Sequence, residues 1–112
     1  MADDLFYVYS DPGPVPEDDF NDWYDNVHLP HVLAVPGFRA AQRFTAVPGV
    51  HGELPALKYL TVYEVETDDL PATLAVLEQA AQQMPFDPLF ERASRRTFAY
   101  TAIGERREDV QC

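Results

Sequence analysis

Cysteine is almost absent from the 112-residue sequence, and the only one, Cys112, is the last residue. It therefore cannot form a disulfide within the chain and is poorly placed to act as an ordered nucleophile. Basic residues are also scarce, with 8 Lys and Arg against 19 Asp and Glu, which gives a formal net charge of −11. This excess of negative charge disfavours nucleic acids and anionic membranes as partners, so that small molecules and other proteins remain.

Long hydrophobic runs and targeting signals are missing too. No stretch approaches the length of a membrane span, and the acidic start of the chain lacks the basic and apolar regions of a signal peptide, so we expect a cytoplasmic protein. No glycine-rich phosphate loop or dinucleotide fingerprint occurs, so we expect no nucleotide cofactor. The length and the 46% hydrophobic content predict a single domain over residues 1–112, with a charged tail that frays from about residue 106.

Strand-like and helix-like segments follow one another in the order β-α-β-β-α-β. We expect strands over 5–9, 38–47, 57–66 and 96–105. We also expect two helices, the first beginning near residue 16 and the second running over 72–84. This order is typical of the ferredoxin-like α+β fold, in which an antiparallel sheet carries both helices on one face. Because the strands have apolar residues on both faces, the uncovered face predicts a homodimer.

Local signals set several boundaries. Pro16 and the carboxylates after it predict the start of the first helix, and Pro30 predicts a kink or a restart. Asp68 or Asp69 is the candidate N-cap of the second helix. Alternation over 38–47 predicts that one face of this strand carries Phe38, Ala40, Gln42 and Phe44, and the other Arg39, Ala41 and Arg43.

The first helix concentrates titratable and aromatic side chains. At about 100° per residue, its apolar face carries Phe20, Tyr24, Val27, His28 and His31. A histidine on such a face is more often a hydrogen-bonded core residue than a catalyst. Two histidines beside Tyr24 nevertheless indicate a polar pocket, because each buried polar tip needs a partner.

A neutral imidazole near pH 7 can take or give a proton, which makes His28 the leading candidate for a general acid or base. His31 is its candidate partner, and Tyr24 could orient an imidazole or stabilise an enolate. The substrate-binding candidates are Asn21, Trp23, Phe44, Tyr63, Tyr7 and Arg43. Alternatives stay open, since Trp23 and the other aromatics could form an ordinary core, and Arg43 could make a surface ion pair.

The stretch Phe20-Asn-Asp-Trp-Tyr-Asp-Asn-Val-His-Leu-Pro30, followed by Pro36-Gly-Phe38, resembles the EthD-like branch of the dimeric α/β-barrel superfamily. The shared pattern is a Trp-Tyr pair, a downstream His-x-Pro and a closing Pro-Gly-Phe. The resemblance implies a ferredoxin-like subunit that pairs as a dimeric barrel. It also implies a ligand cavity between the sheet and the helices of each subunit, with His28 facing it. Related barrels include polyketide cyclases, dehydratases, isomerases, decarboxylases and cofactor-free monooxygenases, so the fold alone does not fix the reaction.

The sequence favours a cofactor-independent lyase or isomerase that abstracts a proton next to a carbonyl of an aromatic or polyketide-like compound. The alternatives are a cofactor-free monooxygenase of a phenolic substrate and a dimer that binds a small molecule without turnover. A metal site on His28 and His31 is disfavoured, because useful affinity normally takes three protein ligands and His51 lies in a remote loop.

Overall fold

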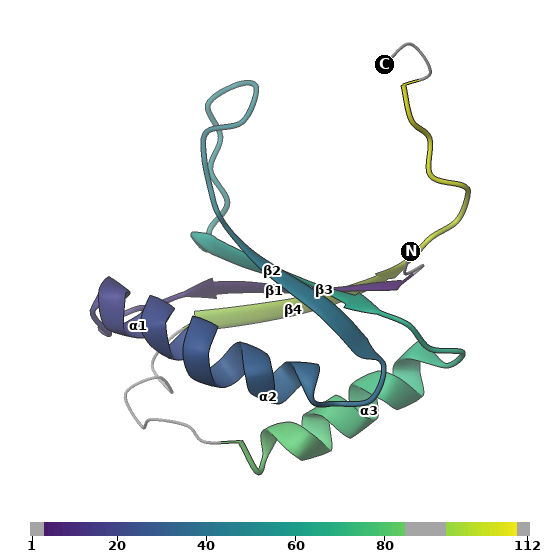
Figure 1. Cartoon of the computed structure of the whole chain (residues 1–112). Helices are drawn as coiled ribbons and strands as arrows, with labels where there is room; N and C mark the ends of the chain where they lie inside the picture. Colours follow the sequence, from purple (N-terminus) through teal and green to yellow (C-terminus); the bar gives the residue numbers. More distant parts are fainter. Residues whose placement is uncertain (1–3, 85–93, 110–112) are drawn as a thin grey trace.

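The computed structural model describes residues 4–84 and 94–109, which form a sheet with helices on one face (Figure 1). The strands are β1 (Asp4–Asp11), β2 (Phe38–Thr45), β3 (Tyr59–Val65) and β4 (Ser94–Thr101). The sheet is antiparallel, with the order β2-β3-β1-β4. The helical segments are α1 (Glu17–Trp23), the π-helical turn η1 (Tyr24–His28), α2 (Leu29–Leu33) and α3 (Leu70–Ala81). This arrangement confirms the predicted ferredoxin-like α+β fold. Cys112 and the end of the tail lie outside the described residues.

The first helical segment begins where the sequence predicts, with Pro16 as the N-cap residue of α1. Its irregularity, however, precedes Pro30. The N–H of Leu29 donates to the carbonyl of Tyr24, five residues earlier, which closes the wide turn η1. Pro30 then occupies the first turn of α2, where its missing N–H is tolerated. The chain thus passes from α1 to α2 through a π-helical turn.

A register shift in β2 corrects the predicted faces of this strand. Phe38 pairs with Val65, but the next paired residue of β2 is Ala40, opposite Glu64, so the strand is irregular between them. An extra residue moves every following side chain to the other face relative to Phe38. Phe38 is therefore buried in the core beneath the helices, whereas Phe44 lies on the uncovered face.

The core lies between the sheet and the helices. Its buried residues are Val8, Val32, Val35, Phe38, Tyr63 and Val65, and the apolar side of α3 packs against them. The carboxylate of Asp69 caps α3 by accepting from the N–H of Ala72 at 3.1 Å, as predicted. Gly37 makes the tight turn into β2 with a φ of +96°.

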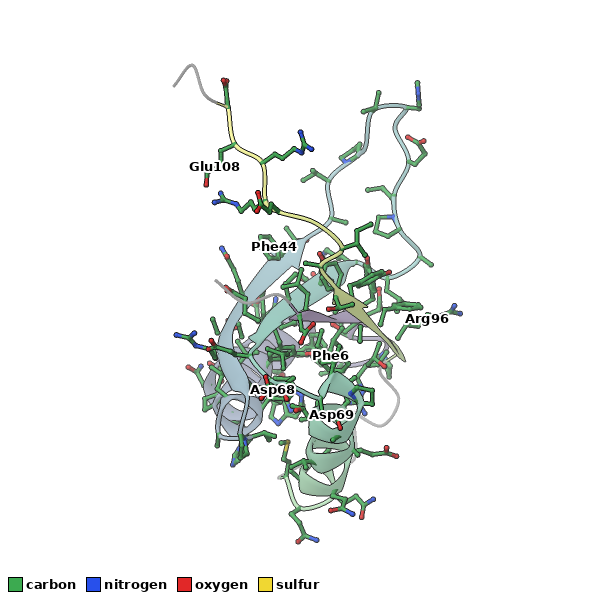
Figure 2. The ribbon with its side chains drawn as sticks, turned by 90° about the vertical axis from the view of Figure 1, so that its right-hand side faces the viewer. Phe6, Phe44, Asp68, Asp69, Arg96 and Glu108 are labelled. Atoms are coloured by element: carbon green, nitrogen blue, oxygen red, sulfur yellow. The ribbon has the colours of Figure 1, made fainter. Side chains whose placement is uncertain are left out.

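None of the described helices lies over the other face of the sheet (Figures 1 and 2). Tyr7 of β1 lies opposite Val62 on one side and Phe98 on the other, so these three side chains share this face. Phe44, Phe98 and Tyr100 are among its exposed large hydrophobic residues. We call this surface the uncovered face.

Candidate functional site

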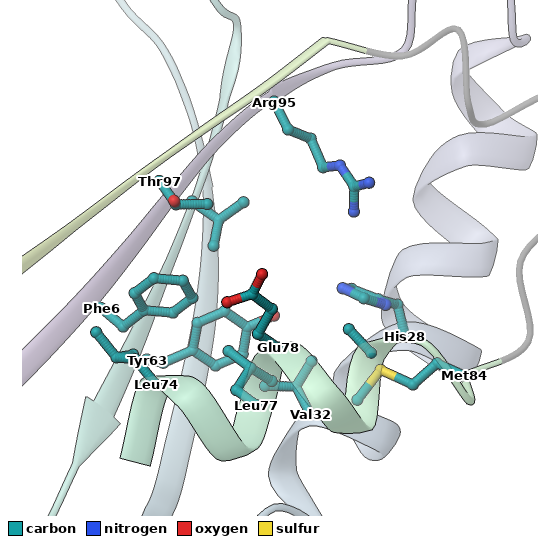
Figure 3. Close-up of a pocket in the computed structure, with 12 residues that line it drawn as sticks. Phe6, His28, Val32, Tyr63, Leu74, Leu77, Glu78, Met84, Arg95 and Thr97 are labelled. Atoms are coloured by element: carbon teal, nitrogen blue, oxygen red, sulfur yellow. The ribbon is translucent and has the colours of Figure 1, made fainter. Parts of the chain in front are cut away.

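A cavity of about 470 Å³ lies between the inner face of the sheet and the helices (Figure 3). Most of its wall is apolar and consists of Phe6, Val8, Val32, Leu74, Leu77, Ala81 and Met84. The polar lining residues are His28, Tyr63, Glu78, Arg95 and Thr97. A largely apolar cavity of this size with a few polar groups is typical of a small-molecule site.

His28 comes from the last position of the π-helical turn and enters this cavity. Its ring stacks on Trp23, with the centroids 4.9 Å apart, and meets the ring of Tyr24 nearly at right angles at 5.0 Å. Burial lowers the pKa of His28 to about 4, and the charge of Arg95 and the nearby His31 act in the same direction. At neutral pH the imidazole is therefore uncharged and can accept a proton, although it is a weak base.

Arg95 and Glu78 supply the charges at this cavity. Figure 3 shows both side chains directed toward the space that His28 also borders. Arg95 lies opposite Ser10 in the sheet and Thr97 lies opposite Val8, which places both on the inner face. A positive charge beside an apolar cavity stabilises an anion formed there more strongly than it would in water.

Buried hydroxyl groups lie behind the cavity wall. Those of Ser10, Tyr24, Thr61 and Tyr63 have no hydrogen-bond partner among the described residues. Burial raises the pKa of Tyr24, against opposing effects from the neighbouring Thr61 hydroxyl and Arg43. Burial and the neighbouring Tyr24 also raise the pKa of Tyr63. Both phenols are therefore neutral at pH 7 and can act only as hydrogen-bond groups.

Of the predicted catalytic residues, only His28 lines this cavity. Tyr24 packs behind it, against Phe20 at 5.6 Å. His31 is exposed, donates from Nδ1 to the carbonyl of Val27 at 2.6 Å, and borders a smaller groove between α2 and α3. The prediction that His28 and His31 share one helix face is not met, because the π-helical turn advances by a smaller angle per residue than an α-helix does. A catalytic role for His31 stays a prediction without support from its position.

Arg43 lies under the helix instead of in the cavity. Its guanidinium sits 4.5 Å from the ring centroid of Tyr24 and donates to Asn21 at 2.9 Å and to Asp25 at 3.1 Å. Asn21 in turn donates weakly to the Tyr59 hydroxyl at 3.4 Å. Arg43 and Asn21 therefore join β2 and β3 to the first helical segment, and they do not reach the cavity.

The remaining substrate-binding candidates lie on two different sides of the sheet. Tyr63 lines the cavity, and Trp23 lies behind the ring of His28, on which it stacks. Tyr7 and Phe44 lie on the uncovered face, on the other side of the sheet, since each is opposite an outward-facing partner in β3. Their side chains cannot line this cavity within one subunit.

Sequence reasoning missed Arg95 and Glu78. The available signals were weak: Glu78 follows Leu74 by four residues and so shares its side of the helix. Arg95 and Thr97 are two residues apart in the last strand, so their side chains point to the same face of the sheet. Neither signal indicates that the two elements converge on His28, because that convergence depends on tertiary packing.

The described residues contain no group of three or more His, Cys, Asp or Glu side chains that could hold a metal ion. In the same part of the chain, none of the helices has the length and apolar character needed to cross a membrane.

Comparison with known proteins identifies the fold. No model of a known protein family matches the chain, and no curated protein sequence matches it. Among solved structures, SnoaB, a cofactor-independent oxygenase from Streptomyces nogalater, is similar with a TM-score of 0.57 and 14% identity. The similarity covers 96% of this chain and 100% of that one.

Two further structures are similar over nearly their whole length. HapK from Hahella chejuensis has a TM-score of 0.54 and 16% identity, with 95% of this chain and 98% of that one covered. A dimeric ferredoxin-like protein from an uncultured marine organism has a TM-score of 0.57 and 17% identity, with 92% and 96% covered. The chain is thus a ferredoxin-like α+β protein, and the similar structures share this fold.

Proposed function

We propose that this chain is a cofactor-independent acid–base enzyme acting on a small, largely apolar molecule, of the aromatic or polyketide-like kind. One observation carries the proposal: an uncharged imidazole and a guanidinium border the same apolar cavity. His28 takes a proton from a C–H next to a carbonyl or from a phenol, and Arg95 stabilises the resulting anion. Because His28 is a weak base, Arg95 has to lower the pKa of the substrate.

The return of the proton completes the reaction. Imidazolium at this position is a strong acid, since burial and Arg95 disfavour its charge. If His28 returns the proton to another carbon of the enolate, the result is isomerisation. If it protonates a departing hydroxyl group, the result is elimination of water. Both outcomes regenerate the neutral imidazole.

A second candidate is oxygenation without a cofactor, favoured by the similarity in fold to SnoaB, which is described as a cofactor-independent oxygenase. It shares the first step, because deprotonation makes an electron-rich anion that can pass an electron to dioxygen. Oxygen uptake that accompanies turnover would favour this reaction over the lyase or isomerase.

The test uses benzoylacetone, an aromatic compound with an acidic C–H between two carbonyls. We expect the wild-type protein to accelerate deuterium exchange at this carbon, followed by NMR. His28→Ala should slow the exchange about 100-fold or more, whereas His51→Ala, in a remote loop, should keep full activity. Full exchange by His28→Ala would contradict the proposal. Binding seen by the fluorescence of Trp23, without exchange even in the wild type, would favour a non-catalytic binding protein.

We also propose that the protein is a homodimer joined through the uncovered face. Tyr7, Val62 and Phe98 present apolar surface there, and an isologous pair would remove this surface from water. One protein of similar fold is described as dimeric. Sedimentation equilibrium at micromolar concentration should give the mass of two chains, and a monomer would contradict the proposal.

A further inference from the structure

Glu78 borders the cavity, but the acid–base reaction proposed above gives it no role. It lies on α3, one turn after Leu74 and next to Leu77, and all three residues line the cavity. Figure 3 shows its carboxylate directed toward the space that the guanidinium of Arg95 and the imidazole of His28 also border. A carboxylate at this place repels the anion that Arg95 attracts.

The charges that the described residues bring to this cavity cancel. His28 is uncharged at neutral pH, because burial and the charge of Arg95 lower its pKa to about 4. Tyr63 is a neutral phenol, since burial raises its pKa. Thr97 and the apolar lining residues carry no charge. One guanidinium and one carboxylate remain, so these residues give the cavity no net charge before a substrate binds.

We infer that Glu78 determines the charge of the substrate, and that it selects an uncharged ketone, ester or lactone against the corresponding carboxylic acid. This inference rests on the acid–base function proposed above. Glu78 repels a substrate carboxylate directly, and it offsets the attraction that Arg95 exerts on one. A carboxylate bound to Arg95 would also occupy the positive charge that the enolate needs.

The same side chain interferes little with the reaction of an uncharged substrate. Transfer of a proton from the substrate to His28 creates an enolate and an imidazolium in one cavity. A fixed charge acts on these two charges with opposite signs, so the repulsion between Glu78 and the enolate is offset by the attraction between Glu78 and the imidazolium. The carboxylate of an acidic substrate has no such counterpart, and Glu78 repels it before and after the proton moves.

The exposure of Glu78 limits the size of this selection. Glu78 and Arg95 are both exposed residues, so water reaches them and weakens their interactions with a bound molecule. Repulsion between two unit charges about 6 Å apart changes an affinity about threefold in bulk water and about 100-fold near a typical protein surface. We therefore expect the carboxylate of Glu78 to change the relative affinity for a charged substrate about fivefold or more.

The experiment compares two probes of nearly the same shape on the full chain. Benzoylacetone is uncharged, whereas benzoylacetate carries a carboxylate in place of the acetyl group. Their dissociation constants are measured through the fluorescence of Trp23, the only tryptophan, so the comparison does not depend on turnover. Glu78→Gln should strengthen the binding of benzoylacetate relative to benzoylacetone about fivefold or more. Arg95→Met should change this ratio in the opposite direction.

Asp68→Asn is the matched control. It removes the same charge from an exposed residue just before α3 that does not line the cavity, so it should keep the wild-type ratio. An unchanged ratio in Glu78→Gln would overturn the inference. Equal changes in Glu78→Gln and Asp68→Asn would also overturn it, because they would assign the preference to the net charge of the chain.

Deuterium exchange separates this inference from the proposed function. If the wild type exchanges benzoylacetone but Glu78→Gln leaves the binding ratio unchanged, the acid–base function stands and the role of Glu78 is overturned. If Glu78→Gln changes the ratio but the wild type exchanges neither probe, the selection by charge stands and the acid–base function is wrong. A wild type that binds neither probe contradicts both.

Discussion

The rings of Trp23 and His28 stack, with their centroids 4.9 Å apart and their planes 17° from parallel. The two residues begin and end the passage from α1 through the π-helical turn, so this wide turn brings them face to face. Trp23 thereby covers one side of the imidazole, and burial is the largest cause of its lowered pKa.

Removing the indole should raise the pKa of His28. In Trp23→Ala, water reaches the ring, and we expect its pKa to move up from about 4 toward its usual value of 6.5. Titration of the imidazole C–H signals by NMR measures this directly. Trp23→Phe keeps an aromatic ring in place and should shift the pKa much less. An unchanged pKa in Trp23→Ala would mean that the indole does not contribute to the burial.

Arg95 should determine the pH below which protonation of His28 abolishes activity. Its positive charge lowers the pKa of His28, so Arg95→Met should raise that pKa and move the acid side of the pH–rate profile to higher pH. Arg96→Met is the matched control, because Arg96 lies opposite Tyr9 on the other face of the sheet. The quantity to measure is kcat/KM for benzoylacetone exchange between pH 4 and pH 8. The same shift in both variants would point to a general effect of net charge.

Protein stability should fall as the pH falls from about 6.5 toward 4, the pKa of His28 in the folded state. In this window the unfolded chain binds a proton at His28 that the folded chain does not, so protonation favours unfolding. The shift corresponds to a loss of about 3 kcal/mol at most. Urea unfolding at both ends of the window measures it, and His28→Gln should have a smaller pH dependence. An equal dependence would assign the acid sensitivity to other groups.

Gly37 should resist substitution. Its φ of +96° is unfavourable for any side chain, and an added Cβ would lie 3.2 Å from Cγ2 of Thr73. We expect Gly37→Ala to lower the free energy of unfolding by about 1–2 kcal/mol, measured by denaturant titration. Gly104→Ala is the control, because a Cβ added there would meet no atom within 4 Å. Equal stabilities would mean that the turn before β2 can rearrange.

Local chemistry predicted the parts of the fold that depend on neighbouring residues in the sequence. Pro16 begins the first helix, and Asp69 caps α3 through the N–H of Ala72. The order of strands and helices followed from periodicity. These features need only a few adjacent residues, so a single sequence contains them.

The wrong or missing predictions depend on single-residue irregularities and on tertiary packing. The register shift after Phe38 and the π-helical turn before Leu29 each change which way later side chains point. Phe44 therefore lies on the opposite face from Phe38, and His31 lies outside the cavity. Arg95 joins His28 only because β4 lies next to β1 in the folded sheet, which no pattern within either segment indicates.

The buried hydroxyls behind the cavity have a consequence for protein engineering. The hydroxyl of Ser10 is kept away from water without a hydrogen-bond partner among the described residues. Such a group costs free energy when it is buried, whereas an apolar group of the same shape does not. Ser10→Ala is therefore the first substitution to make when a more heat-resistant form of this protein is wanted, and Ser10 does not line the cavity.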